Sequence, residues 1–406
     1  MAPRHLAAIA VVITALAPWL RPAVVGATND AIQSERELGP RGFPMERDRA
    51  ARAATERDSA NMGHSLPWHP ASLSQTQEAL DVTAVATYGW ESLGDSTRRL
   101  SEKERRAMGG VLARPNALVE GADGALYVLD RDFRKIVVFN RDGSLRRVIL
   151  GGYGEGPGEF VRPRDMSLGP SGHVVVIDES LSRFTVFDTS GRLIRSRAMR
   201  VGSPYGVAAL GDRYLVLRWY RSGEPVVSVL DTLGAHLGDT LRLTERDYEF
   251  SKGGERGKLG MTSMGEVLYA HPTVGRWTSI QTGVSGGNAL VPDMHFGIWK
   301  DRDGETPYTT AGPRGIGRFR DGSTLLYYGA FDTEAMRQRR IMMTYFLTLF
   351  DSRGRPRTVR VPSEGRGAFA TSRTGQDFYL STEEPFPRVV RYRINTMSSP
   401  RTSRPF

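Results

Sequence analysis

The sequence contains no cysteine in its 406 residues. This absence excludes a thiol nucleophile, a cysteine-ligated metal and a lipid-modified cysteine, and it leaves no disulfide to stabilise the fold. A chain of this length without disulfides must take its stability from a large apolar core.

Long apolar runs are also scarce. The run from Leu6 to Leu20 is interrupted by Pro18, and its length of about 15 residues falls short of the roughly 20 that cross a bilayer. A basic start and small residues up to Ala27 flank it, so a cleaved signal peptide over 1–27 is favoured over a membrane anchor. We expect export to the periplasm or the extracellular space, with no stable membrane insertion after cleavage.

Amphipathic helix patterns are rare, and they are confined after residue 81 to 101–110 and 332–340. Residues 28–80 show no strand alternation, which is typical of a flexible or partly helical segment. From 81 to 396, short apolar runs alternate with Gly, Asp, Ser and Pro, which predicts many short strands in one domain. We expect a disordered tail over 397–406.

Acidic residues are outnumbered, and the formal net charge is +10. Most of the excess is arginine, whose planar fork binds carboxylates and phosphates. An exported protein with this charge fits an anionic small molecule, an acidic glycan or a protein segment better than nucleic acid. A solubility bias without a partner is the alternative, and we expect a monomer.

Two copies of one repeat align at a constant offset of 48 residues, starting at Arg114 and Arg162. Four weaker copies follow, and a period near 50 made of short strands is typical of a propeller blade. The sequence therefore predicts an all-β, six-bladed β-propeller with four-stranded antiparallel blades. The last copy ends after its third strand, so Val82 to Trp90, within the segment 81–101, should close the ring.

The second copy resembles the repeat of NHL-type six-bladed propellers over about 113–200. That repeat links blades by a glycine-rich segment, an aromatic and a proline, then places Asp after the second strand and Arg before the third. The matching residues are Phe160, Pro163, Asp178 and Arg183. The first copy keeps Asp130 but has Lys135 for the arginine, and Phe133 and Leu181 replace the family's asparagine. The resemblance implies a fold that serves both binding proteins and enzymes.

The stretch GGYGEGPGEF, residues 151–160, is rich in glycine. A phosphate-binding loop would need its glycines to open a helix, and prolines with a strand pattern follow instead. We interpret the glycines as positive-φ turns between the outer strand of one blade and the inner strand of the next.

Two motifs suggest catalysis or metal binding. Gly283 to Gly287 fits the nucleophile elbow G-x-S-x-G with Ser285, but no helix pattern follows it. His271 and His295 with Asp293 could be imagined as metal ligands, yet they lack ligand spacing. A glycine loop and hydrogen-bonded or surface histidines are the favoured interpretations.

Two Asp-Gly stretches, 301–305 and 140–144, are reminiscent of calcium loops. A calcium loop alternates oxygen ligands over about twelve residues, and neither stretch extends that far. Turns between strands explain both.

Overlaying the starts of the six predicted inner strands places mostly basic residues at one end of the central channel. Loops from every blade converge there, so these side chains are candidate ligand-binding residues. The candidates are Asn116, Arg164, Tyr205, Arg256 or Lys258, Arg314 and Arg366. The alternative is that arginine is simply abundant and these residues lie on the outer face.

The sequence thus favours an exported binding scaffold, with an anionic ligand at the channel, over an enzyme. The alternative function is a metal-dependent hydrolase or lyase of the propeller type. No catalytic residue and no cofactor are predicted, although a divalent cation in the channel remains compatible with the fold.

Overall fold

A computed structural model provides the structure of the chain. The residues that it describes are 80–89, 109–169, 171–219, 224–243, 248, 257–272, 276–283, 285–286, 298–300, 307–309, 311–331, 343–361, 367–383 and 386–395. The predicted signal peptide, the segment 28–79, the two predicted helices except residues 109 and 110, and the tail lie outside these ranges.

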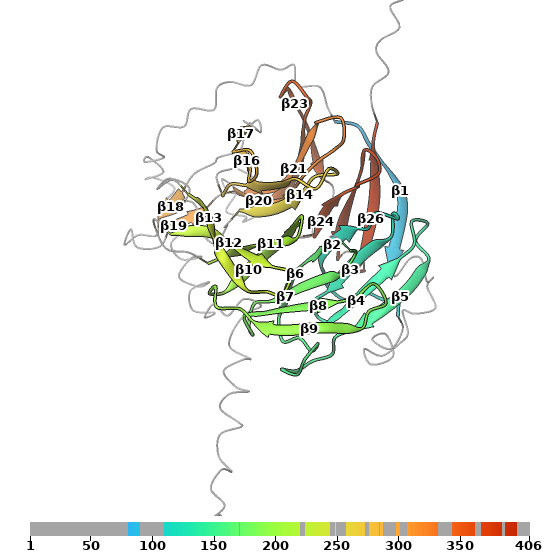
Figure 1. Cartoon of the computed structure of the whole chain (residues 1–406). Helices are drawn as coiled ribbons and strands as arrows, with labels where there is room; N and C mark the ends of the chain where they lie inside the picture. Colours follow the sequence, from blue (N-terminus) through green and yellow to red (C-terminus); the bar gives the residue numbers. More distant parts are fainter. Residues whose placement is uncertain are drawn as a thin grey trace, which may run out of the picture. The chain divides into compact units, whose positions relative to one another are not determined.

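Six four-stranded antiparallel sheets form the blades of a propeller (Figure 1). Blade 1 comprises β2 (Pro115–Glu120), β3 (Leu126–Asp130), β4 (Lys135–Phe139) and β5 (Leu145–Leu150). Blade 2 comprises β6 (Pro163–Leu168), β7 (Val174–Asp178), β8 (Arg183–Phe187) and β9 (Leu193–Ala198). Blade 3 comprises β10 (Pro204–Leu210), β11 (Arg213–Arg218), β12 (Pro225–Asp231) and β13 (His236–Arg242).

The remaining blades have the same antiparallel order. Blade 4 comprises β14 (Lys258–Met261), β15 (Val267–Ala270), β16 (Trp277–Ser279) and β17 (Ser285–Gly286). Blade 5 comprises β20 (Ala311–Arg318), β21 (Thr324–Phe331), β22 (Met343–Phe350) and β23 (Pro356–Val361). Blade 6 comprises β24 (Phe369–Thr371), β25 (Asp377–Thr382), β26 (Arg388–Ile394) and β1 (Val82–Gly89). A separate hairpin of β18 (Ile298–Lys300) and β19 (Pro307–Thr309) lies between blades 4 and 5 in sequence.

The ring is closed by strands from opposite ends of the chain. The innermost strands touch in a cycle, β2 with β6, then β10, β14, β20 and β24, and β24 returns to β2. The strand that we expected at Val82 to Trp90 is β1, which pairs with β26 from Val82 opposite Ile394 to Gly89 opposite Arg388. The six-bladed, four-stranded architecture predicted from the repeats is confirmed.

Burial differs systematically between the strands of a blade. The second and third strands of blades 1 and 2 are almost wholly buried, because each sheet packs against a neighbour on both faces. The fourth strands, β5 and β9, are largely exposed and carry arginines among their aliphatic residues. The sequence follows this division, with apolar runs such as VVVID at the centre and charged runs such as LIRSRA at the edge.

Side-chain hydrogen bonds join neighbouring blades where no backbone ladder does. On β6, Asp165 accepts a hydrogen bond from the Val207 backbone N–H at 2.9 Å, and Ser167 accepts one from the Ala209 N–H at 3.0 Å. Arg318 on β20 pairs with Glu266 of blade 4 at 2.7 Å. Each bond fixes one blade against the next.

Blades 1 and 6 are joined through one buried carboxylate, that of Glu120, which is 1% exposed. It accepts hydrogen bonds from the hydroxyls of Ser372 and Tyr379, each at 2.8 Å, and from the backbone N–H of Arg373. Proximity to this carboxylate and burial both raise the pKa of Tyr379. The interface that completes the ring therefore depends on a polar network.

The aspartates and basic residues that follow the repeat pattern hold the connections between blades. Asp178 accepts hydrogen bonds from the backbone N–H groups of Val161 and Arg162, which lead into β6. Arg183 donates to the carbonyl oxygen of Gly156 at 2.7 Å, within the glycine-rich loop. In blade 1, Lys135 donates in the same way to the Gly109 carbonyl at 3.2 Å, so lysine keeps the arginine's structural role.

The glycine-rich loop connects β5 to β6, as the sequence indicated. Gly152, Gly154 and Gly158 have φ angles of 76°, 155° and 85°, and Tyr153 bridges Phe160 across the loop. A Cβ on Gly151 would lie 2.2 Å from the ring of Phe160, which is fully buried. The glycines serve chain reversal and close packing.

Candidate functional site

The overlaid positions at the inner-strand starts share a backbone feature. In β2, β6, β10 and β20 the register with the second strand shifts directly after a proline, at Asn116, Arg164, Tyr205 and Arg314. Such a bulge leaves one residue without a partner and re-aims its side chain. The same local sequence, proline followed by a large polar residue, thus presents a side chain at the same point of four blades.

The bulge residues of blades 1, 2 and 3 contact one another in sequence, and Lys258 at the start of β14 in blade 4 joins them. The guanidinium of Arg164 lies over the ring of Tyr205, 4.4 Å from its centroid, and the ammonium of Lys258 lies 4.6 Å from the same centroid. Asn116 donates a hydrogen bond to the carbonyl oxygen of Arg164. We call Asn116, Arg164, Tyr205 and Lys258 the strand-start cluster.

The ring at the centre of the stack is buried, and an exposed tryptophan packs against it. Tyr205 is 7% exposed, and its ring meets that of Trp219, which is 42% exposed, edge-on at 6.4 Å. A cation over an aromatic face is attracted by the ring's quadrupole, so the tyrosine can hold two cations near each other. The cluster places positive charge from blades 2 and 4 on one ring from blade 3.

Of the other predicted positions, Arg314 lies in the described part of the chain. Arg314 occupies the bulge of β20, is half-buried, and lies near Tyr327, whose pKa is raised mainly by burial. Arg256 and Arg366 lie outside the described residues. The structure therefore places Asn116, Arg164, Tyr205 and Lys258 together and Arg314 at an equivalent point of its own blade.

One charged residue at this end of blades 1 and 2 was missed by the overlay. Arg131 directly follows β3, and its backbone N–H donates to the carbonyl oxygen of Arg114 at 2.9 Å. Burial lowers the pKa of Arg131, and the positive charges of Arg162, Arg164 and Arg114 lower it further. Its only sequence signal was its place after Asp130, which fixes the start of the same blade.

A carboxyl group lies beside the cluster. Burial raises the pKa of Asp165, while hydrogen bonds from Val207 and Met166 and the charges of Lys258 and Arg164 lower it. Because the pKa is raised on balance, the folded protein favours the neutral form of this acid over a wider pH range than an exposed aspartate would.

The catalytic motifs do not form a catalytic arrangement among the described residues. Ser285 lies on the edge strand β17, and its hydroxyl meets that of Thr278 at 2.9 Å. Thr278 in turn meets Nε2 of His271 at 2.8 Å, so serine and histidine are separated by a threonine. His271 is 6% exposed and hydrogen-bonded, as expected. His295 and Asp293 lie outside the described ranges.

The calcium-like stretch that the structure describes forms a turn between two strands. At 140–144, Asp142 accepts hydrogen bonds from the N–H and hydroxyl of Ser144, and Gly143 has a φ of 92°, which is a turn between β4 and β5. The stretch 301–305 lies outside the described part of the chain. Within that part, no three His, Asp or Glu side chains group closely enough to hold a metal ion.

Comparison with known proteins supports the fold. A family model described as 6-bladed beta-propeller matches residues 112–222, which span blades 1 and 2 and the start of blade 3. A search of curated protein sequences gave no match.

Solved structures of low sequence identity share the architecture. A protein of Bacteroides fragilis described as exported is 12% identical, covers 80% of this chain and 98% of its own, and gives a TM-score of 0.55. A member of the DUF4221 family from Bacteroides vulgatus is 9% identical, covers 79% and 99%, and gives 0.53. Virginiamycin B lyase from Staphylococcus aureus is 10% identical over 70% and 96%, with a TM-score of only 0.43. At these identities the likeness concerns the fold alone.

Proposed function

We propose that this propeller is an exported binding scaffold that takes an anionic ligand at the strand-start cluster. The observation that carries the proposal is the stack of Arg164 and Lys258 on Tyr205, which joins cations from two blades on a ring from a third. The proposal includes two expectations from the sequence, namely that the blades are NHL-type repeats and that a signal peptide directs export. Within the described residues, no helix is long and apolar enough to cross a bilayer.

The electrostatics favour a ligand with more than one negative charge. Burial lowers the pKa of Arg131, and the positive charges of Arg162, Arg164 and Arg114 lower it further, so these arginines lie close enough to repel it. Two of them have acidic partners, Arg114 with Glu383 at 3.5 Å and Arg162 with Glu179 at 3.3 Å. An anion near Arg131 and Arg164 would reduce the remaining repulsion and gain charge-assisted hydrogen bonds. An acidic glycan, an acidic protein segment or a small polyanion has this chemistry.

Removing the two stacked cations tests the proposal. The double variant Arg164→Gln, Lys258→Gln should bind sucrose octasulfate about tenfold more weakly, since each charge-assisted hydrogen bond contributes roughly 1.5–3 kcal/mol before screening. Calorimetry at low and high ionic strength measures the affinity, and the difference should shrink in high salt.

A matched control removes two arginines that lie elsewhere. Arg197 on β9 and Arg353 after β22 are exposed, so Arg197→Gln, Arg353→Gln lowers the net charge equally without touching the cluster. Equal weakening in both double variants would show that overall charge, and not the cluster, binds the polyanion. Inorganic phosphate and polygalacturonate, tested alongside, separate phosphate from uronic-acid preference.

The pH dependence of binding gives an independent test through Asp165. Its pKa is raised, so as pH falls through that pKa the carboxylate gains a proton and stops neutralising Lys258 and Arg164. Affinity for sucrose octasulfate, which stays ionised, should therefore rise by about two- to fivefold on acidification. Calorimetry over the pH range in which the protein stays folded measures it.

The Asp165→Asn variant is the reference for this pH profile. It keeps one acceptor for the Val207 and Met166 N–H groups and removes the titration, so its profile should be flat. If the affinity of Asp165→Asn still rises on acidification as much as that of the unchanged protein, another group is responsible for the pH dependence.

A further inference from the structure

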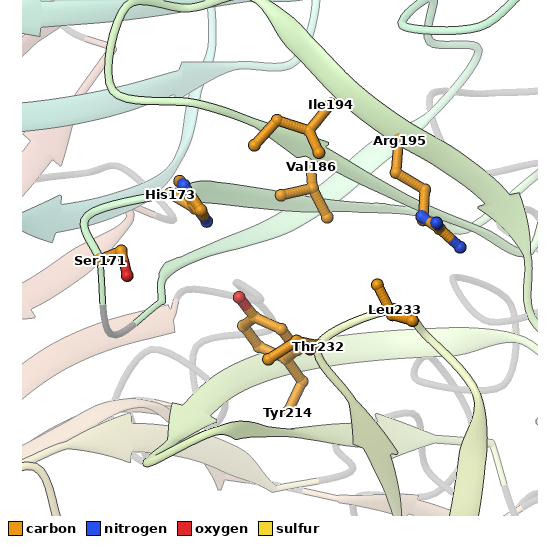
Figure 2. Close-up of a pocket in the computed structure, with 8 residues that line it drawn as sticks. All are labelled: Ser171, His173, Val186, Ile194, Arg195, Tyr214, Thr232 and Leu233. Carbon is orange, nitrogen blue, oxygen red and sulfur yellow. The ribbon is translucent and has the colours of Figure 1, made fainter.

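A pocket of about 280 Å³ lies between blades 2 and 3, away from the strand-start cluster. Arg164 is at the beginning of β6, whereas the pocket is reached beyond its end, at Ser171 and His173 before β7. Val186, Ile194, Arg195, Tyr214, Thr232 and Leu233 complete the lining (Figure 2). Because the two sites lie at opposite ends of β6, what binds in this pocket is independent of the proposed anion site.

The pocket has an apolar wall that is partly open to solvent. Val186 is 4% exposed, whereas Ile194 and Leu233 are 48% and 49% exposed at the rim. A pair of half-exposed aliphatic side chains facing one pocket is suited to cover a small apolar group. The volume lies just below the range of about 300–1,000 Å³ that is typical of ligand sites, so the ligand is small.

Five polar side chains line the same pocket without a hydrogen-bond partner in the described part of the chain. They are the hydroxyls of Ser171, Tyr214 and Thr232, the imidazole of His173 and the guanidinium of Arg195. Figure 2 shows the Tyr214 hydroxyl directed toward Ser171 and His173, with Arg195 at the opposite side of the pocket. At near-neutral pH each of these groups can donate a hydrogen bond, and Arg195 adds a fixed positive charge.

Tyr214 is the most telling of these groups. It is 2% exposed, and burial raises the pKa of its hydroxyl. A Cβ added to Gly169 would lie 2.3 Å from that hydroxyl, so glycine gives the phenol its room. A buried hydroxyl without a protein acceptor has its hydrogen-bonding capacity available to whatever enters the pocket.

We propose that this pocket binds a small carboxylate carried on an apolar group. The carboxylate accepts hydrogen bonds from Tyr214 and Ser171, while the apolar group lies against Val186, Ile194 and Leu233. Arg195 lies across the pocket, and its positive charge attracts the carboxylate at longer range. A free aliphatic or aromatic acid and the C-terminal residue of a peptide both carry this chemistry.

The test uses 4-methylpentanoate and its neutral amide with the full mature chain. Chemical-shift changes or calorimetry should detect binding of the acid at millimolar concentration. The protein should bind the amide at least about tenfold more weakly. Tyr214→Phe should weaken acid binding by about tenfold, and Arg195→Gln, which removes a charge that acts from across the pocket, by about twofold. A tripeptide ending in leucine, compared with its C-terminal amide, distinguishes a peptide terminus from a free acid.

Two controls separate binding from structure. Arg197→Gln, on the same strand as Arg195 but outside the pocket lining, should leave acid binding unchanged. Tyr214→Phe should not lower the melting temperature of the ligand-free protein, because the hydroxyl it removes has no protein partner. Absence of acid binding, equal binding of acid and amide, or unchanged affinity in Tyr214→Phe would each overturn the proposal.

Discussion

A mature chain that lacks residues 28–90 should fail to form a stable ring. The deletion removes β1, whose Tyr88 is fully buried and meets the rings of Phe139 and Tyr379 edge-on at 5.8 and 5.9 Å. It also removes Leu80, which is 2% exposed, and leaves β26 with an unpaired edge. Burial of the two side chains alone contributes about 3–6 kcal/mol, which is comparable to the roughly 5–15 kcal/mol stability of a whole domain.

The reference for this deletion is a chain that lacks only residues 28–75. It keeps β1 and Leu80, so its melting temperature by circular dichroism should match that of the mature chain. The longer deletion should melt far lower, lose cooperativity or aggregate through the exposed strand. Similar melting of the two truncations would mean that β1 contributes little to the ring.

Replacing Glu120 with alanine should lower the free energy of unfolding by about 3–5 kcal/mol. The change leaves the hydroxyls of Ser372 and Tyr379 and the Arg373 N–H without their acceptor at a buried interface. Removing one partner of a buried network costs more than the bond itself gains, because the remaining groups stay desolvated. Urea denaturation measures the change.

Two further variants show whether the network is responsible. Glu155 is exposed in the glycine-rich loop, so Glu155→Ala removes the same charge and should change stability by less than about 0.5 kcal/mol. Glu120→Gln keeps one acceptor and the shape, and its loss should be intermediate. A stability of Glu120→Ala within the range of Glu155→Ala would contradict the role assigned to the carboxylate.

The fold was predictable because the same side chains recur once in each of the first two blades, where they make the same structural contacts. Asp178 and Arg183 recur with their counterparts Asp130 and Lys135 because each blade must hold the connection that precedes it. Central strands are buried and outer strands are exposed, so apolar and charged runs alternate along the sequence in the order of the strands. These constraints act within one blade and its connection, which is the range over which a sequence repeat is visible.

The candidate site was predictable only in part. The positions after the inner-strand prolines follow from the repeat, and the structure gives them a shared bulge at Asn116, Arg164, Tyr205 and Arg314. Which of them touch depends on distances between blades, and no repeat encodes that. Arg131 belongs to a different strand end and enters only through its proximity to other arginines. The pocket at Tyr214 likewise arises between two blades, from residues with no common motif.

The pairing of the first described strand with the last has a consequence for the order in which the chain matures. Thr83 and Asn395, which are joined by a hydrogen bond, are 312 residues apart, so β1 leaves the ribosome long before its partner strand is synthesised. Closing so long a loop is a late and slow event, because the entropy of the intervening chain is lost before the contacts form. Until then β1 has no strand to pair with. Its residues Thr83, Ala84 and Val85 remain exposed even in the closed ring. Tyr88, the largest apolar side chain of the strand, packs against Phe139 of blade 1 and Tyr379 of blade 6, so its burial is completed only when the last blade has formed.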